Sequence, residues 1–497
     1  MEPVAPEANV SASREVVDLP KVRTGIEGLD EILRGGIPAG GTTLIWGSAG
    51  CGKSILGLEF LYRGALAGDP GILVIFEERA QAVRQHALTL GWHLTPLEQS
   101  GKVFLLEGTV DPAAILAGDF ELQALLAIIQ GQAQALRAKR IVIDAIDVLT
   151  RLYRDPWREQ SELYTLHRWL TDREMTTILT MKVLQYQTPL PGYEFLDFMA
   201  DCVIKLDQRS NNQLSTRRLQ VIKYRGSGFG RNEYPYIIAH DGIHLLPVSS
   251  VILTMQAPGE VLSTGIAQLD TMLTGGYKRG TSVLIPGSPG TGKTTIASAF
   301  AQAACARSEK TLFLAFEESE ETVIANMLSP GIDLRPALQA GTLRFITAMP
   351  ETMGAEEHLF TALRAVAAFQ PRLVIVDALS SILRMGTDQA AFEYAMRLLL
   401  DCKERGITCL FTNQLFGTNP DSSFAGVGIS SLIDTVILLR LVESGGMLHR
   451  TLLIRKARGS AHSTECHEFR ITDHGLEFLG VYTGSHDEDY RPSRRPW

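Results

Sequence analysis

The chain has 497 residues, of which 45% are apolar and 21% are charged, and its formal net charge is −8. This length exceeds what one hydrophobic core supports, so we expect at least two domains. The acidic balance disfavours a protein whose main task is to hold nucleic acid along a basic groove. No apolar run approaches the ~20 residues that span a bilayer, and no pair among the six cysteines has the C-x-x-C spacing of a zinc site or a redox dithiol. We therefore predict a cytoplasmic protein with reduced thiols and no membrane contact.

In chain order, the first half begins with residues 1–20, whose Pro, Ala, Ser and Glu content predicts a disordered lead-in and not a signal peptide. A β-strand is predicted over 42–46 and a helix over 55–66, with a glycine-rich loop between them. Other short apolar runs are rich in β-branched residues and predict buried strands over 72–76, 140–144, 176–181 and 202–206.

The second half repeats the first. TGIEGLDEIL begins at Thr24 and TGIAQLDTML begins at Thr264, an offset of 240 residues (264 − 24). The offset falls to 233 by Asp144 and Asp377 (377 − 144), which places about seven extra residues in a surface loop of the first half, within 110–122. The corresponding strands are predicted over 281–286, 311–316, 372–377, 408–413 and 435–441. Strands that alternate with helices predict an α/β fold with mostly parallel sheets, which bind ligands at the carboxyl ends of their strands.

A P-loop motif, G-x-x-x-x-G-K-[ST], follows the first strand of each half. Its glycines let successive backbone N–H groups point at phosphate oxygens, its lysine reaches the β- and γ-phosphates, and its hydroxyl residue ligates Mg²⁺. Two matches at equivalent points of a repeat are far beyond chance, so both halves are predicted to bind ATP and Mg²⁺. The predicted nucleotide-binding residues of the two loops are Gly47, Ser48, Ala49, Gly50, Cys51, Gly52, Lys53 and Ser54, and Gly287, Ser288, Pro289, Gly290, Thr291, Gly292, Lys293, Thr294 and Thr295.

One aspartate in each half closes an apolar strand in the Walker-B manner, Asp144 in the first half and Asp377 in the second. A carboxylate at this place meets the Mg²⁺ shell through water or through the hydroxyl residue of the P-loop, here Ser54 or Thr294. The alternative is an ordinary aspartate that caps the next turn. The recurrence after the same kind of strand favours the metal site.

A pair of glutamates ends the second strand of each half, Glu77-Glu78 and Glu317-Glu318. Adjacent strand residues point to opposite faces, so only one glutamate of each pair is expected to activate an attacking water or hydroxyl. The alternative is a solvated acidic turn, and the fixed distance from the P-loop favours catalysis over it.

The motif K-x-R-G recurs late in each half, as Lys223 to Gly226 and Lys456 to Gly459. Two fixed cations at such a place can reach the γ-phosphate of a neighbouring subunit, as arginine fingers do. This interpretation requires a ring or filament of subunits, whereas the alternative is a basic surface turn that pairs with local acids.

Together these motifs resemble the KaiC family of circadian clock ATPases and kinases with its bacterial and archaeal relatives, from about Val22 to Thr483. The resemblance implies two tandem RecA-like P-loop NTPase domains, an ATPase domain over 21–247 and an autokinase domain over 248–483, followed by a short tail over 484–497. It also implies a homohexamer with ATP at the subunit interfaces, ATP hydrolysis in the N-terminal ring and serine/threonine autophosphorylation in the C-terminal ring.

Carried over by position, the resemblance makes Glu77 and Glu317 the general bases and places Glu317 beside Mg²⁺ as well. The family's adjacent Ser-Thr phosphorylation pair falls on Ser430 and Ser431, so the second acceptor is Ser where well-known members have Thr. The cations implied to contact nucleotide across the interface are Lys223, Arg225, Lys456 and Arg458, with Arg450.

The resemblance also bears on partners. It leaves a KaiB-like protein as a candidate partner, whereas the short tail after Thr483 departs from members whose longer extension engages the activator KaiA, so docking of such an activator is not expected. Two other functions remain open. A DNA-directed ATPase of the RecA or RadA type needs a basic, glycine-rich DNA loop, which the sequence lacks. A nucleotide-gated scaffold with little turnover could dispense with Glu77 and Glu317, which are both present.

Overall fold

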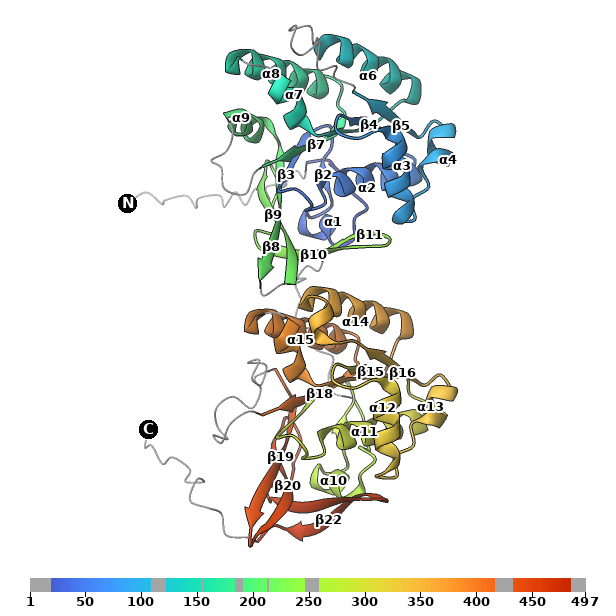
Figure 1. Cartoon of the computed structure of the whole chain (residues 1–497), viewed down its shortest axis with the longest axis vertical. Coiled ribbons are helices and arrows are strands. Elements are labelled where there is room, and N and C mark those ends of the chain that lie inside the picture. Colours follow the sequence, from blue (N-terminus) through green and yellow to red (C-terminus); the bar gives the residue numbers. More distant parts are fainter. Residues whose placement is uncertain are drawn as a thin grey trace, which may run out of the picture. The chain divides into compact units, whose positions relative to one another are not determined.

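The computed structural model describes residues 19–108, 122–152, 155–183, 191–211, 214–245, 259–385, 387–415 and 432–483. Apart from the short segment Ser210–Ser215, which groups with the second unit, the chain divides after Pro247 into two compact units, each built around one large sheet (Figure 1). Most of the predicted lead-in, the predicted insertion up to residue 121, the pair Ser430-Ser431 and the tail lie outside the described residues.

The first unit begins with a short β-ladder and then alternates strands with helices. Its strands are β1 Lys21–Val22, β2 Ile37–Pro38, β3 Thr42–Gly47, β4 Gly71–Ile75, β5 Val103–Glu107, β6 Arg140–Asp144, β7 Thr176–Lys182, β8 Cys202–Asn211, β9 Leu214–Tyr224, β10 Glu233–Ala239 and β11 Gly242–Leu245. Its helices are α1 Leu29–Ile32, α2 Lys53–Leu66, α3 Ala80–Thr89, α4 Leu94–Gln99, α6 Leu122–Leu136, α7 Ile146–Leu152, α8 Pro156–Thr171 and α9 Pro191–Met199.

The second unit repeats this order. Its strands are β12 Val261–Leu262, β13 Tyr277–Lys278, β14 Ser282–Gly287, β15 Thr311–Ala315, β16 Leu343–Thr347, β17 Leu373–Asp377, β18 Thr408–Gln414, β19 Thr435–Ser444, β20 Met447–Ala457, β21 His467–Thr472 and β22 Gly475–Val481. Its helices are α10 Ala267–Met272, α11 Lys293–Ala306, α12 Glu320–Leu328, α13 Arg335–Gln339, α14 Ala355–Phe369 and α15 Asp388–Glu404, with the 3₁₀ segments η1 Pro350–Thr352 and η2 Leu379–Met385.

The two large sheets have the same strand order. The first runs β11-β10-β9-β8-β3-β7-β6-β4-β5, and the second, read from its other end, runs β22-β21-β20-β19-β14-β18-β17-β15-β16. The strands from β8 to β5 and from β19 to β16 pair in parallel, and the strands beyond them pair antiparallel where the structure describes the pairing. The predicted α/β fold with two tandem, mostly parallel RecA-like sheets is therefore confirmed.

Helices cover both faces of the first sheet. On one face, α1 to α4 pack with strand residues such as Ile45 and Leu73 into one hydrophobic core. On the other face, α6 to α9 pack against Leu44, Ile143 and their neighbours into a second core. The central strands are apolar on both sides because both sides are covered. Among the described residues no helix has the length and apolar character needed to cross a bilayer.

Candidate active site

Each P-loop joins the central strand of its sheet to the following helix, β3 to α2 and β14 to α11 (Figure 1). Gly52 and Gly292 precede these helices with φ of 90° and 93°, in the left-handed region that favours glycine. A Cβ atom on Gly47 would lie 2.1 Å from the carbonyl oxygen of Leu206, so this glycine lets the loop lie directly on β8. The loop glycines are thus required by backbone geometry, as the phosphate-binding interpretation assumes.

The two P-loops differ at three positions, and one of these, Cys51 against Thr291, keeps the same internal hydrogen bond. The Cys51 thiol donates to the carbonyl oxygen of Ser48 at 2.9 Å, and the Thr291 hydroxyl donates to that of Ser288 at 2.8 Å. Burial raises the pKa of the Cys51 thiol, so this thiol is held neutral as a small donor in place of threonine.

The P-loop lysines lie over their own loops. Lys53 Nζ donates to the carbonyl oxygens of Gly47 and Ser48 at 3.1 and 2.8 Å, and Lys293 Nζ donates to the equivalent oxygens in the second loop at 3.0 and 2.9 Å. Burial lowers the pKa of Lys293, although the nearby carboxylates of Asp377 and Glu317 oppose the shift. Phosphate oxygens are the acceptors that match these ammonium groups.

The Walker-B aspartates end β6 and β17 and face the P-loops. Asp377 accepts hydrogen bonds from Thr412 at Oδ1 and from Thr294 at Oδ2, the latter at 2.8 Å. In the first unit, Thr180 donates to Oδ1 of Asp144 in the same way. Burial raises the pKa of Asp377 despite the two hydroxyl donors. In the second unit the P-loop hydroxyl thus lies beside the aspartate, and the peptide bond after each aspartate is cis.

The two glutamates of each pair lie in different surroundings. Glu317 Oε1 accepts a hydrogen bond from the hydroxyl of Ser381 at 2.6 Å, next to the Walker-B strand. Glu318 instead accepts from Asn326 at 3.2 Å, and Glu78 lies 3.3 Å from the His86 ring, each on the helix that follows. The second glutamate of each pair thus contacts the following helix, whereas Glu317 lies near Lys293 and Asp377, which makes Glu317 and, through the repeat, Glu77 the better placed candidates.

A model of the KaiC ATPase family matches residues 22–250 and 262–481, one match for each unit. The chain belongs to the KaiC family of ATPases. It is 40% identical over 473 residues to "Circadian clock protein KaiC2" of Synechocystis sp., covering 94% of this chain and 83% of that protein. It is 34% identical over 460 residues to "Circadian clock oscillator protein KaiC" of Synechococcus elongatus, covering 92% and 88%. Both units are therefore ATP-binding domains of KaiC type.

The K-x-R-G cations of this KaiC-family chain lie where the parallel strands of each sheet begin, whereas the P-loop lies where these strands end. In the first unit, the backbone N–H of Arg225 donates to Asp201, whose own N–H donates to Thr42 at the start of β3. In the second unit, the backbone N–H of Arg458 donates to Asp434, and the N–H of Asp434 donates to Ser282 at the start of β14. Each P-loop begins at the far end of that strand, and the five steps from Thr42 to Gly47 cover about 17 Å.

The same cations have local partners. Lys223 Nζ donates to the carbonyl oxygens of Asp197 and Phe198 in the last turn of α9, at 2.5 and 3.2 Å. Arg225 also donates to Phe198, at 2.5 Å. Cations at the carboxyl end of a helix are favourable in themselves, so the local role exists alongside any role in catalysis.

Arg450 differs from the other cations assigned by resemblance. Its Nε donates to the carbonyl oxygen of Gly290 at 3.1 Å, so it lies at the P-loop of its own unit. The family resemblance had placed Arg450 in one group with Lys456 and Arg458, but these two residues lie where the parallel strands begin, away from the P-loop. Ser430 and Ser431 lie outside the described residues, and the chain resumes at Leu432 just before β19.

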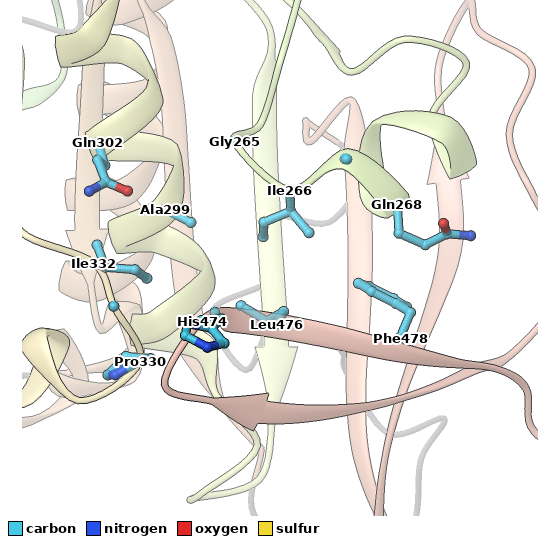
Figure 2. A pocket seen from close by; sticks show the side chains of 13 residues that line it. Gly265, Ile266, Gln268, Ala299, Gln302, Pro330, Ile332, His474, Leu476 and Phe478 are labelled. Carbon is cyan, nitrogen blue, oxygen red and sulfur yellow. The ribbon is translucent and has the colours of Figure 1, made fainter.

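A pocket of about 430 Å³ opens in the second unit between α11 and the β21–β22 hairpin. Figure 2 shows Ile266, Gln302, Ile332 and Leu476 around it. No P-loop residue and no Lys, Arg, Asp or Glu side chain lines it, and its polar side chains are Gln268, Gln302 and His474. The repeat places other residues at this point of the first unit, where the carboxylate of Glu59 accepts from Arg63 and from the backbone of Ile243. The pocket is thus separate from the P-loop residues of its unit.

Sequence reasoning did not identify three hydroxyl groups of these sites. Thr180 and Thr412 occupy equivalent places near the ends of β7 and β18, and a closer alignment of TTILTM with TCLFTN could have singled them out. Ser381 has no such signal, because the residue at its place in the first unit is Val148.

Proposed function

We propose that both units hydrolyse Mg²⁺-ATP and that the second unit also transfers the γ-phosphoryl group to a serine of a neighbouring copy. Glu77 and Glu317 take the role of general base, since each follows a strand end that faces the P-loop lysine. In the second unit the proximity of Glu317 to both Lys293 and Asp377 supports this assignment. A base near the γ-phosphate can accept the proton of an attacking water or hydroxyl.

The donor set fits Mg²⁺. Thr294 and Asp377 bring a hydroxyl and a carboxylate oxygen within 2.8 Å of each other, and Ser54 with Asp144 would supply the same groups in the first unit. Among the described residues there is no cluster of three or more His, Cys, Asp or Glu for a metal ion, which agrees with an ion that takes one or two carboxylates and completes its shell with water and phosphate. When bound, Mg²⁺ neutralises charge that develops on the transferred phosphoryl group.

The position of the K-x-R-G cations carries the proposal of a ring. Arg225 and Arg458 lie a full strand length from the P-loop of their own unit, a distance longer than an arginine side chain. They therefore cannot reach phosphate in their own unit, and we propose that they act on phosphate bound by another copy of the chain. A head-to-tail contact that closes on itself gives a ring, and the family resemblance supports six subunits.

The acceptor serines follow the same logic. Asp434 lies beside Ser282 at the start of β14, the end of that strand opposite to the P-loop, and Ser430 and Ser431 precede it by only four and three residues in the sequence. Transfer to Ser430 or Ser431 of a neighbouring copy is therefore easier than transfer within one copy. In this step the serine oxygen bonds to the γ-phosphorus, the bond to the β,γ-bridging oxygen breaks to leave ADP, and Glu317 takes the hydroxyl proton.

The relatives are named as circadian clock proteins. On that basis we propose that this chain works as an ATP-driven regulatory switch in the cytoplasm, with a KaiB-like protein as its candidate partner. A purified KaiB-like protein that does not bind the chain in Mg²⁺-ATP, as measured by native mass spectrometry, would remove this partner.

One experiment tests both parts of the biochemical proposal. The full chain and its Glu317→Gln variant are incubated with Mg²⁺-ATP and analysed by native mass, intact mass and peptide mapping. We expect a hexamer for both, and phosphate on Ser430 or Ser431 for the unmodified chain alone. A monomer at saturating Mg²⁺-ATP would contradict the ring. Robust ATP hydrolysis without phosphoprotein would contradict the kinase.

A further inference from the structure

Ser381 stands directly behind the Walker-B strand of the second unit. It lies in η2, is 1% exposed, and its backbone N–H donates to Ala378 at 3.1 Å. Its hydroxyl donates to Oε1 of Glu317 at 2.6 Å, a short hydrogen bond of the charge-assisted kind. A buried and well-held donor thus fixes one oxygen of a carboxylate whose residue is otherwise exposed.

The first unit offers an internal comparison. Val148 occupies the place of Ser381, since its backbone N–H donates to Ala145 at 3.2 Å just as Ser381 bonds to Ala378. Valine has no donor, and within the described residues Glu77 has no hydrogen bond or ion pair. The two units share the P-loop lysine, the Walker-B aspartate and its threonine, but they differ at the support of the glutamate.

We propose that Ser381 is a positioning residue that orients Glu317 for proton transfer in the second unit. The terminal torsion of a glutamate is broad and nearly two-fold, so an unsupported carboxylate samples many directions. With Oε1 held by Ser381, the remaining oxygen, Oε2, is the one that receives the proton. This inference rests on the proposed function of Glu317 as general base.

The difference between the units matches the acceptors proposed for them. Water is small and can approach Glu77 from several directions, so a mobile base suffices for hydrolysis. A serine side chain delivered by a neighbouring copy arrives along one fixed line, and proton transfer then requires a base of fixed direction. The hydroxyl of Ser381 supplies that direction only in the unit where transfer to protein is proposed.

The test uses the full chain carrying Glu77→Gln, so that the first site is silent and turnover reports the second. The measured rate is the sum of phosphate release and phosphoprotein formation at saturating Mg²⁺-ATP, and ATP affinity is measured separately. We expect Ser381→Ala to lower this rate about tenfold, a part of what a general base contributes, with ATP affinity changed less than about twofold. Ser381→Thr, which keeps the hydroxyl, should restore most of the rate.

Ser380→Ala is the matched control. This neighbouring serine is also buried, but its hydroxyl accepts from the backbone N–H of Gln414 at 3.2 Å and does not contact Glu317. Its rate should stay within about twofold of the parent, because proton transfer does not depend on it. Equal losses in Ser380→Ala and Ser381→Ala would show a structural effect and overturn the inference.

Two further results separate the inference from the function on which it rests. If Glu317→Gln abolishes turnover while Ser381→Ala leaves it unchanged, the positioning role is wrong and the base assignment stands. If Glu317→Gln itself leaves turnover unchanged, the proposed function fails first. Peptide mapping closes the test, because phosphate found on Ser381 would make it an acceptor and overturn the positioning role.

Discussion

Replacement of Thr412 by valine should destabilise the second unit through one lost hydrogen bond. The Thr412 side chain is fully buried and its hydroxyl donates to Oδ1 of Asp377, whose charged form is already disfavoured by burial. Valine keeps the shape of threonine and removes the donor. A hydrogen bond to a charged group contributes about 1.5–3 kcal/mol, so we expect a loss of about 2 kcal/mol in the free energy of opening.

Hydrogen exchange measured by mass spectrometry gives this loss for each unit separately. A change of about 2 kcal/mol corresponds to roughly 30-fold faster exchange through opening, and it should appear in peptides from β17 and β18. Peptides of the first unit should keep their rates. Thr180→Val is the matched variant, since Thr180 donates to Asp144, and it should reverse the pattern. Unchanged exchange in both variants, or equal acceleration in both units, would refute the reasoning.

Two other predictions concern the same site and the ring. Burial raises the pKa of Asp377 above its ordinary value of 3.8, so the folded chain holds this proton more tightly than the unfolded chain. The protonated Asp377 side chain therefore contributes its full stabilisation of the fold below pH 3.8. This stabilisation declines as the pH rises through the raised pKa. Asp377→Asn should remove the decline, as measured by denaturation at a series of pH values that starts at the ordinary pKa and rises from there. The Lys293→Ala and Arg458→Ala variants should each be inactive in the second unit when assayed alone. When they are mixed one to one before Mg²⁺-ATP is added, we expect about a quarter of the phosphoryl transfer of the unmodified chain. In random assemblies about one neighbouring pair in four then combines an intact P-loop with an intact Arg458. No recovery above the separate variants would argue against action between copies.

The nucleotide-binding core of each unit could be predicted from the sequence because its signals are local. The P-loop needs glycine at fixed places, and the parallel strands around it are short continuous apolar runs, such as 140–144 and 373–377, because both of their faces are covered. The antiparallel strands beyond β8 and β19 were not predicted. A segment such as β9 carries charged residues between apolar ones, which gives no continuous apolar run.

The contacts that complete the site depend on strand order, which the sequence does not state. Thr412 reaches Asp377 because β18 lies next to β17, although β18 follows it only after the whole of α15. Which glutamate of each pair faces the P-loop also depends on contacts that the sequence does not state. The alternation of strand residues predicted that one member of each pair would face the P-loop, but only the neighbouring Ser381 and Asn326 identify Glu317 as that member.

The placement of charge in each unit links catalysis to assembly. In each unit the phosphate-binding loop, the Walker-B carboxylate and the glutamate lie where the parallel strands end. The K-x-R-G cations of the same unit lie where these strands begin. Within one unit these two sets of groups lie about one strand length apart and do not meet. Among the differences between the units, the support of the glutamate, Ser381 against Val148, is the one next to the proposed base, so a difference in acceptor chemistry can arise without any change in the K-x-R-G cations.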